Sequence, residues 1–133
     1  MAKHARALDD ASPVALTKVA DDFAEQGALV FAAQAYAQAA RIIDDVETSA
    51  RTAQRAWTCF DRCNQVRSRE MDALERPLSD RETEVAHLAA SGITSREIAE
   101  RLFVSQRTID NHLRNVYRTF GVGQRADLAP LFA

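Results

Sequence analysis

The sequence lacks any apolar run that approaches the roughly 20 residues needed to cross a bilayer. Its first ten residues, MAKHARALDD, also lack the apolar segment of a secretion signal. We therefore expect a cytoplasmic protein that has no membrane partner.

Cysteine is also scarce. The only two cysteines, Cys59 and Cys63, lie four residues apart in a segment with a helical pattern. No histidine or second cysteine pair lies close enough in sequence to complete a zinc set. We interpret both cysteines as small core residues, in preference to a redox pair or a metal site.

Catalytic patterns are missing too. No carboxylate pair, no nucleophile with a base and no metal set converges on one predicted element. The phosphate-binding pattern GxxxxGK[ST] is absent, and no strand is predicted that could precede it. The chain is therefore predicted not to be an enzyme, to need no cofactor and not to bind ATP.

Residues 78–128, by contrast, have the pattern of four short helices with marked boundaries. Ser79 and Thr94 each precede a glutamate by three residues, which is the spacing of a capping box. Gly92 and Gly121 are suited to stopping helices, and Ser105 to capping the third one. The predicted helices span residues 80–90, a short segment after Thr94, 106–120 and about 124–131.

The first three of these helices can share one small core. Three apolar sets fall at helical spacing: Val85, Leu88 and Ala89; Ile98, Ala99 and Leu102; Ile109, Leu113, Val116 and Phe120. Residues 103–105 form a connection too short for anything but a sharp corner, as between the two helices of a helix-turn-helix motif.

With its apolar residues turned inward, the helix 106–120 would present a polar and mostly basic outer face. A major groove admits one α-helix, and Asn and Arg can each pair with base edges. We expect base contacts from Asp110, Asn111 and Arg114. Phosphate contacts are expected from side chains at helix starts and on the same face: Thr94, Ser95, Ser105, Arg107, Thr108, His112, Arg118 and Arg125.

Net charge neither supports nor excludes this interpretation. The whole chain has a formal charge of −2, and seven arginines after Pro77 are balanced by seven carboxylates. Most of those carboxylates belong to the first two predicted helices, however. The third helix carries three arginines against Asp110 alone, so a local basic face remains.

The stretch LSDRETEVAHLAASGITSREIAERLFVSQRTIDNHLRNVYRTFGV resembles the LuxR-type helix-turn-helix domain of bacterial transcription regulators. The resemblance covers residues 78–128 and rests on Leu78, Arg81, Glu82, Glu84, Val85, Gly92, Glu97, Ile98, Ala99, Leu102, Ser105, Thr108, His112, Gly121, Val122 and Arg125. Three places depart from the usual pattern: Ser95 stands where Asn is usual, Asp110 where Lys is frequent, and Thr119-Phe120 where Lys-Leu is usual.

The first half of the chain is predicted to be helical as well. Residues 1–11 are interpreted as a frayed or disordered start, residues 12–66 as a helical hairpin module, and residues 67–77 as a connector. The helices expected in the module run from Pro13 to before Gly27, over residues 28–45 and over about 47–66. The last two resemble a tetratricopeptide-like hairpin through Ala33, Tyr36, Ala53, Trp57 and Phe60.

The expected fold class is therefore all-α: a helical hairpin module, then a four-helix LuxR-type domain at residues 78–133. This order resembles the C-terminal end of the large ATP-binding LuxR-type regulators. The resemblance implies sequence-specific binding of double-stranded promoter DNA, with the helix 106–120 in the major groove. The alternative is a helical interaction or oligomerisation module whose DNA reader is weakened, for which Asp110 is the main evidence.

Partners beyond DNA are expected as well. Pairing of two copies would let two readers span two half-sites, so a homodimer is predicted. One candidate surface is the last helix, with Leu128 and Leu131. The other is the apolar side of the first module, around Phe31, which we favour. Upstream domains or the transcription machinery are further expected partners.

Overall fold

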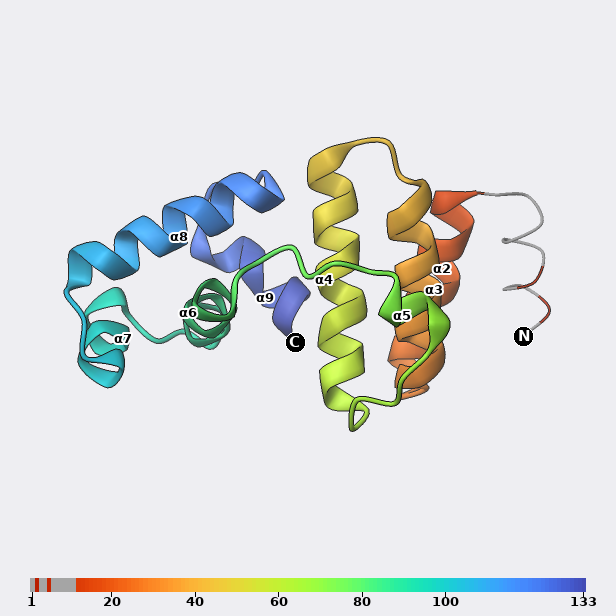
Figure 1. Cartoon of the computed structure of the whole chain (residues 1–133), viewed down its shortest axis with the longest axis horizontal. Helices are drawn as coiled ribbons and strands as arrows, with labels where there is room; N and C mark the ends of the chain where they lie inside the picture. Colours follow the sequence, from red (N-terminus) through yellow and green to blue (C-terminus); the bar gives the residue numbers. More distant parts are fainter. Residues whose placement is uncertain (1, 3–4, 6–11) are drawn as a thin grey trace. The chain divides into compact units, whose positions relative to one another are not determined.

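A computed structural model describes residues 2, 5 and 12–133; the predicted frayed start at residues 1–11 lies almost entirely outside these. The described part of the chain is helical and contains no strand, so the predicted all-α class is confirmed (Figure 1). It divides into two compact units, residues 1–76 and 77–133. None of the described helices is long and apolar enough to cross a membrane.

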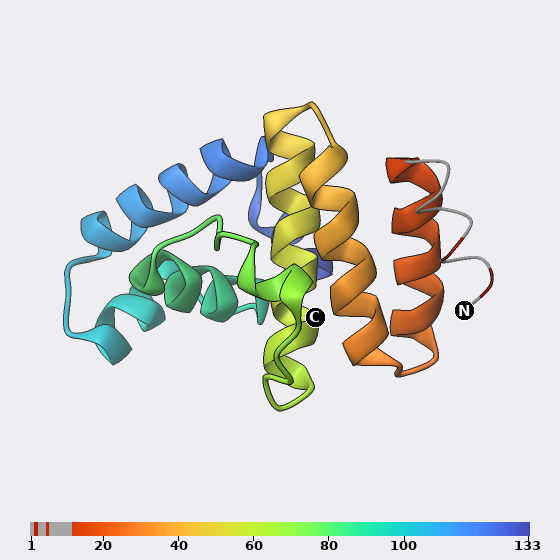
Figure 2. The same cartoon turned by 45° about the vertical axis from the view of Figure 1, so that its right-hand side comes forward.

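The first unit is built on three helices, α2 (Pro13–Glu25), α3 (Leu29–Ile42) and α4 (Val46–Arg62), and α3 contacts both of the others (Figure 2). Ser12 caps α2 by accepting the Ala15 N–H at 3.2 Å, and Pro13 occupies the first turn. Asp45 caps α4 through the Thr48 N–H at 2.9 Å. The unit also contains the single helical turn α5 (Arg69–Asp72).

Two predicted helix ends in this unit were placed too late. The helix expected to reach residue 45 ends at Ile42, because Asp45 must be extended to cap α4. The helix expected to reach residue 66 ends at Arg62, because Asn64 and Gln65 adopt positive φ angles of 61° and 56°. Neither residue is a glycine, so the sequence carries no strong signal for this stop.

Alanine fills the centre of the first unit. Because these side chains are small, α3 can lie close to its neighbouring helices. The core is therefore stabilised by close contact between helices more than by large side chains. The buried alanines of α3 are Ala32, Ala33, Ala35, Ala37, Ala39 and Ala40. Cys59 is buried in the same core, where burial raises the pKa of its thiol.

A polar network joins the three helices. The Tyr36 hydroxyl of α3 donates to Asp21 Oδ1 of α2 at 2.5 Å, and Arg55 of α4 donates to the same oxygen at 3.0 Å. Burial, and then the hydrogen bond to Asp21, raise the pKa of Tyr36 above its ordinary value of 10.0. The neutral phenol is therefore the form that the folded unit stabilises.

We expect Tyr36→Phe to lower the stability of the first unit by about 1 kcal/mol, since Asp21 is partly exposed and recovers some solvation. The wild-type stability contributed by Tyr36 is full below pH of roughly 10 and declines above it, because the raised pKa favours the protonated phenol. Urea unfolding followed by Trp57 fluorescence measures both effects. Tyr117→Phe is the matched control. If Tyr36→Phe lost as much stability at alkaline pH as the parent chain does, the assignment of this pH dependence to Tyr36 would be contradicted.

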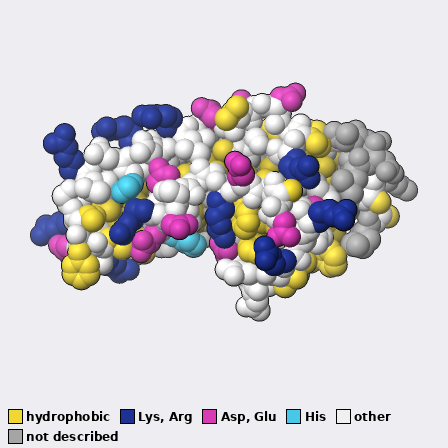
Figure 3. Space-filling model, viewed as in Figure 1, with side chains coloured by type: hydrophobic (Ala, Val, Ile, Leu, Met, Phe, Trp, Pro, Cys, Tyr) yellow, Lys and Arg dark blue, Asp and Glu magenta, His cyan; other side chains and the backbone are white. Residues whose placement is uncertain are grey.

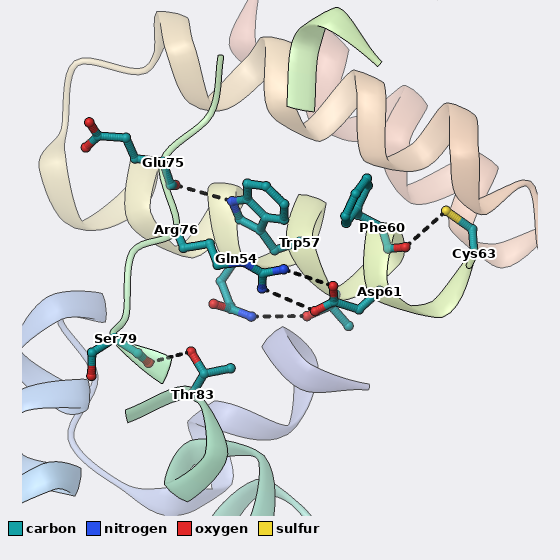
Figure 4. A network of polar contacts seen from close by, with 10 residues as sticks. Gln54, Trp57, Phe60, Asp61, Cys63, Glu75, Arg76, Ser79 and Thr83 are labelled. Carbon is teal, nitrogen blue, oxygen red and sulfur yellow. Dashed lines mark hydrogen bonds and ion pairs between the residues drawn. The ribbon is translucent and has the colours of Figure 1, made fainter. Parts of the chain in front are cut away.

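Residues 67–76 belong to the first unit, where α5 packs on α3 and α4. Met71 of α5 is buried in its core. The Trp57 indole N–H donates to the Glu75 carbonyl at 3.3 Å, and Arg76 pairs with Asp61 at 3.0 Å (Figure 4). The Arg76 guanidinium also lies 4.1 Å from the centre of the Trp57 ring. The single helical turn expected in this segment is α5.

The second unit follows the predicted boundaries closely. Its helices are α6 (Asp80–Ala90), α7 (Ser95–Leu102), α8 (Gln106–Phe120), the 3₁₀ turn η1 (Arg125–Leu128) and α9 (Ala129–Phe132). Both predicted capping boxes, Ser79 with Glu82 and Thr94 with Glu97, are present. The expected continuous fourth helix is wrong. Pro130 cannot donate the backbone hydrogen bond that such a helix needs there, and the segment splits into η1 and α9.

One small core closes the second unit. Most of the three predicted apolar sets are buried, whereas Leu88 and Leu102 are only half-buried. Leu128, Leu131 and Phe132 are also buried. The rings of Phe120 and Phe132 meet edge to face, with centroids 6.3 Å apart. This packing fixes one side of α8 inward and leaves the other side outward.

Candidate nucleic-acid interface

The outer face of α8 is the candidate site. The apolar residues Ile109, Leu113, Val116 and Phe120 are all buried. Five of the residues predicted to face outward are exposed: Arg107, Asp110, Asn111, Arg114 and Arg118. The helix is thus amphipathic, with a buried apolar side and an exposed charged side, and Figure 3 shows basic side chains gathered along its outer edge.

Both ends of α8 are fixed by the sequence. Ser105 Oγ accepts the Thr108 N–H at 3.1 Å, and the two hydroxyl oxygens lie 2.9 Å apart. Gly121 adopts a φ of 65°, which ends the helix in the left-handed conformation. The outer face therefore begins and stops at defined positions.

The corner between α7 and α8 has a feature that sequence reasoning missed. Phe103 ends α7 in the left-handed conformation, with a φ of 57°, and its side chain is 95% exposed. An aromatic residue seldom adopts this conformation, so no sequence signal marks it. The Val104 N–H donates to the Ala99 carbonyl at 3.1 Å, which holds the corner tight.

The charges of α8 are available to a ligand. Among the described residues, Arg107, Asp110, Arg114 and Arg118 form no ion pair or hydrogen bond through their side chains. Arginines on the two preceding helices are engaged instead: Arg81 pairs with Glu84 at 3.4 Å and Arg96 with Glu100 at 3.5 Å. Part of the negative charge of the second unit is thus compensated by ion pairs within α6 and within α7.

Arg125 and Ser95, both predicted to contact phosphate, bind each other in the structure. The Arg125 guanidinium donates to Ser95 Oγ at 3.0 Å and to the Ile93 carbonyl. These bonds tie η1 to the first turn of α7, across 30 residues of sequence. A hollow of about 320 Å³ beside them brings Ser95 and Arg125 together with Asp110 and Arg114.

The remaining predicted phosphate residues lie at helix starts or on α8. Thr94 is exposed, but its hydroxyl oxygen already accepts the Glu97 N–H at 3.2 Å. Ser105 is exposed, whereas Thr108 and His112 are half-buried on α8. These residues thus lie at the starts of α7 and α8 and along α8, and their contact with phosphate stays a prediction.

The dimer candidates differ sharply in exposure. Leu128 is 0% and Leu131 5% exposed, so neither offers a free apolar side chain. Leu128 is instead part of the core of its own unit. Phe31 of α3 is 41% exposed, and its ring lies 5.5 Å from that of Phe23.

Comparison with known proteins identifies this unit. Residues 76–132 match the family described as bacterial regulatory proteins, luxR family. A protein of Mycobacterium bovis named as an HTH-type transcriptional regulator is 41% identical over 51 residues, which are 38% of this chain and 6% of that protein. The nitrate/nitrite response regulator protein NarP of Escherichia coli is 36% identical over 77 residues, covering 54% of this chain and 36% of NarP.

A Haemophilus influenzae homologue of the nitrate/nitrite response regulator protein is 38% identical over 55 residues, or 41% of this chain and 26% of that protein. No solved structure matches the chain significantly. The chain therefore spans about a third or less of the length of these relatives. Residues 76–132 form a luxR-family helix-turn-helix domain, and the resemblance predicted from the sequence is confirmed.

Proposed function

We propose that the chain binds double-stranded DNA sequence-specifically as part of a bacterial transcription regulator, with α8 in the major groove. The observation that supports this most directly is the outer face of α8, whose three arginines, Asn111 and Asp110 are exposed and have no partner among the described side chains. The relatives that share the domain are named as transcriptional or response regulators. A charged face of this kind, on a helix fixed by a buried core, suits phosphate and base edges.

Within this proposal, Asn111 and Arg114 approach base edges. Arg114 can bond two acceptors of guanine, and Asn111 can pair with adenine. Asp110 has one favourable option, which is to accept a hydrogen bond from a cytosine amine. Otherwise its charge repels phosphate and weakens binding.

Arg114→Ala tests the base contact. We expect the affinity for the selected site to fall by about 1 to 3 kcal/mol, with relaxed preference at one base pair. The site is first selected from random duplexes, and affinities are then measured by fluorescence anisotropy. Arg69→Ala, which removes an equal charge from the first unit, should bind as the parent chain does.

Asp110→Lys separates the two roles of Asp110. If the carboxylate only repels phosphate, the variant binds random DNA more tightly and keeps its site preference. If it reads cytosine, the preference at that base pair is lost.

Equal affinity and preference in the parent chain and Arg114→Ala would refute the placement of α8.

Arg125 is proposed to orient the start of α7, because its guanidinium is already engaged by Ile93 and Ser95. We therefore expect Arg125→Met to weaken DNA binding while the slope of log affinity against log salt stays unchanged. A direct phosphate contact would instead reduce that slope by about 0.9. Ser95→Ala should weaken binding in the same way, and the double variant should lose less than the sum of the two.

Two copies are proposed to act together, since one reader of this size makes few base contacts and a dimer gains by spanning two half-sites about 34 Å apart. The surface around Phe31 is the better candidate, because Leu128 and Leu131 are buried. Sedimentation of Phe31→Asp beside the parent chain measures this. If both sediment as monomers at high concentration, pairing through this surface is refuted.

A further inference from the structure

A hollow of about 500 Å³ lies at one end of the first unit, and none of its lining residues is assigned to DNA. It is formed where α2 starts, α3 ends and α4 starts, and these three ends lie together in Figures 1 and 2. Its volume is in the range that holds small organic ligands. Its wall includes Pro13, Val14, Thr17, Ile43, Thr48 and Thr52.

The wall of the hollow is mainly apolar, and most of its polar groups are already hydrogen-bonded. Pro13, Val14 and Ile43 are apolar, and each of the three threonine hydroxyls already donates a hydrogen bond. Thr17 donates to the Pro13 carbonyl at 2.8 Å and Thr52 to the Thr48 carbonyl at 2.9 Å. Thr48 donates to Asp45 Oδ2 at 2.5 Å. A ligand seated here gains mainly from removing its own apolar surface from water.

The two charged residues of the hollow, Asp21 and Lys18, differ in availability. Asp21 accepts from both Tyr36 and Arg55, so its negative charge is compensated. Lys18 is exposed at the hollow and has no ion pair or hydrogen bond among the residues that the structure describes. Lys18 is therefore the one charged lining residue without a described partner, while the Asp45 carboxylate, which borders the hollow at Thr48, accepts the Thr48 N–H and hydroxyl.

We propose that this hollow binds an aliphatic carboxylate, with its hydrocarbon chain against the apolar wall and its carboxylate beside the Lys18 ammonium. The positive charge of Lys18 favours an anionic head group. The three threonine hydroxyls already donate hydrogen bonds within the protein, which favours a hydrocarbon tail. The proposal is independent of DNA binding, because it uses only residues of the first unit.

Decanoate, kept below the concentration at which it forms micelles, is the probe for isothermal titration with the full chain. We expect saturable binding that strengthens by about fourfold for each methylene from hexanoate to decanoate, which is the usual gain for a buried methylene. Lys18→Met, which keeps the apolar stem, should weaken decanoate by roughly two- to fivefold, the range for an exposed ion pair. Decanol, which lacks the charge, should bind this variant and the parent chain equally.

A bulky side chain placed at the hollow provides the second test. Val14 is 79% exposed, so Val14→Trp should fold, and its indole should fill the hollow and weaken decanoate at least about tenfold. Val46 is also 79% exposed but does not line the hollow, so Val46→Trp is the matched control and should bind as the parent chain does.

Three results would overturn the proposal. They are binding that does not depend on chain length, equal loss in Val14→Trp and Val46→Trp, and unchanged decanoate affinity in Lys18→Met. A second copy seated on this face would instead appear as a dimer that Val14→Trp dissociates, without decanoate binding. That outcome would also refute the carboxylate site.

Discussion

Phe120→Ala is expected to destabilise the second unit by about 3 to 5 kcal/mol, which is the usual cost of removing a buried aromatic ring. Phe120 is the largest of the fully buried side chains that the structure describes, and its ring packs against Phe132. The expected loss of stability has two parts. Apolar area is no longer buried, and a cavity remains that the capped helices cannot readily close. Total stabilities of small domains are of similar size, so the unit should be largely unfolded near its working temperature.

Two probes can separate the units in this experiment. Trp57, the only tryptophan, lies in the first unit, so its fluorescence reports that unit, while far-ultraviolet circular dichroism reports both. We expect Phe120→Ala to add an early dichroism transition without an equal shift in fluorescence. Phe103→Ala is the matched control, since Phe103 is 95% exposed and its loss should change stability by less than about 0.5 kcal/mol. Equal melting of the two variants would contradict the assigned core.

The second large effect is expected from removing Arg107 and Arg118 together. Both are exposed on α8 and form no ion pair among the described residues, so each can neutralise one phosphate. Loss of two such contacts should reduce the slope of log affinity against log salt by about 1.8 and weaken binding at 0.15 M salt by roughly thirtyfold. The preference among sequences should remain, because phosphate contacts carry no base information.

Anisotropy titrations at several salt concentrations measure this slope. A double variant of Arg67 and Arg69, both exposed in the first unit, removes the same charge and should leave the slope unchanged. If the two double variants behave alike, the effect reflects net charge, and the basic face of α8 has no special role.

Much of the second unit could be predicted from the sequence because its signals are local. A capping box is completed within four residues, and a left-handed stop needs only its own glycine, so Ser79, Thr94 and Gly121 were sufficient to place helix ends. The spacing of Ile109, Leu113, Val116 and Phe120 likewise fixed which side of α8 is outward. The family resemblance rested on the same short range of residues.

Other features depended on contacts between distant segments. The bond of Arg125 to Ser95 joins residues 30 apart, and nothing in either position's local pattern distinguishes this tie from a phosphate contact. Asp21, Tyr36 and Arg55 come from three different helices, so their shared network could not be read from any one of them.

The sequence alone determined the all-helical class, the luxR-family domain and the outward face of α8, because turn chemistry and helical periodicity act over a few residues. Only the tertiary structure decided that Leu128 and Leu131 are buried, that Arg125 and Ser95 bind each other, and that an apolar hollow lies beside Lys18. Burial and pairing of this kind depend on which distant surfaces meet, and that follows from the packing of the whole unit.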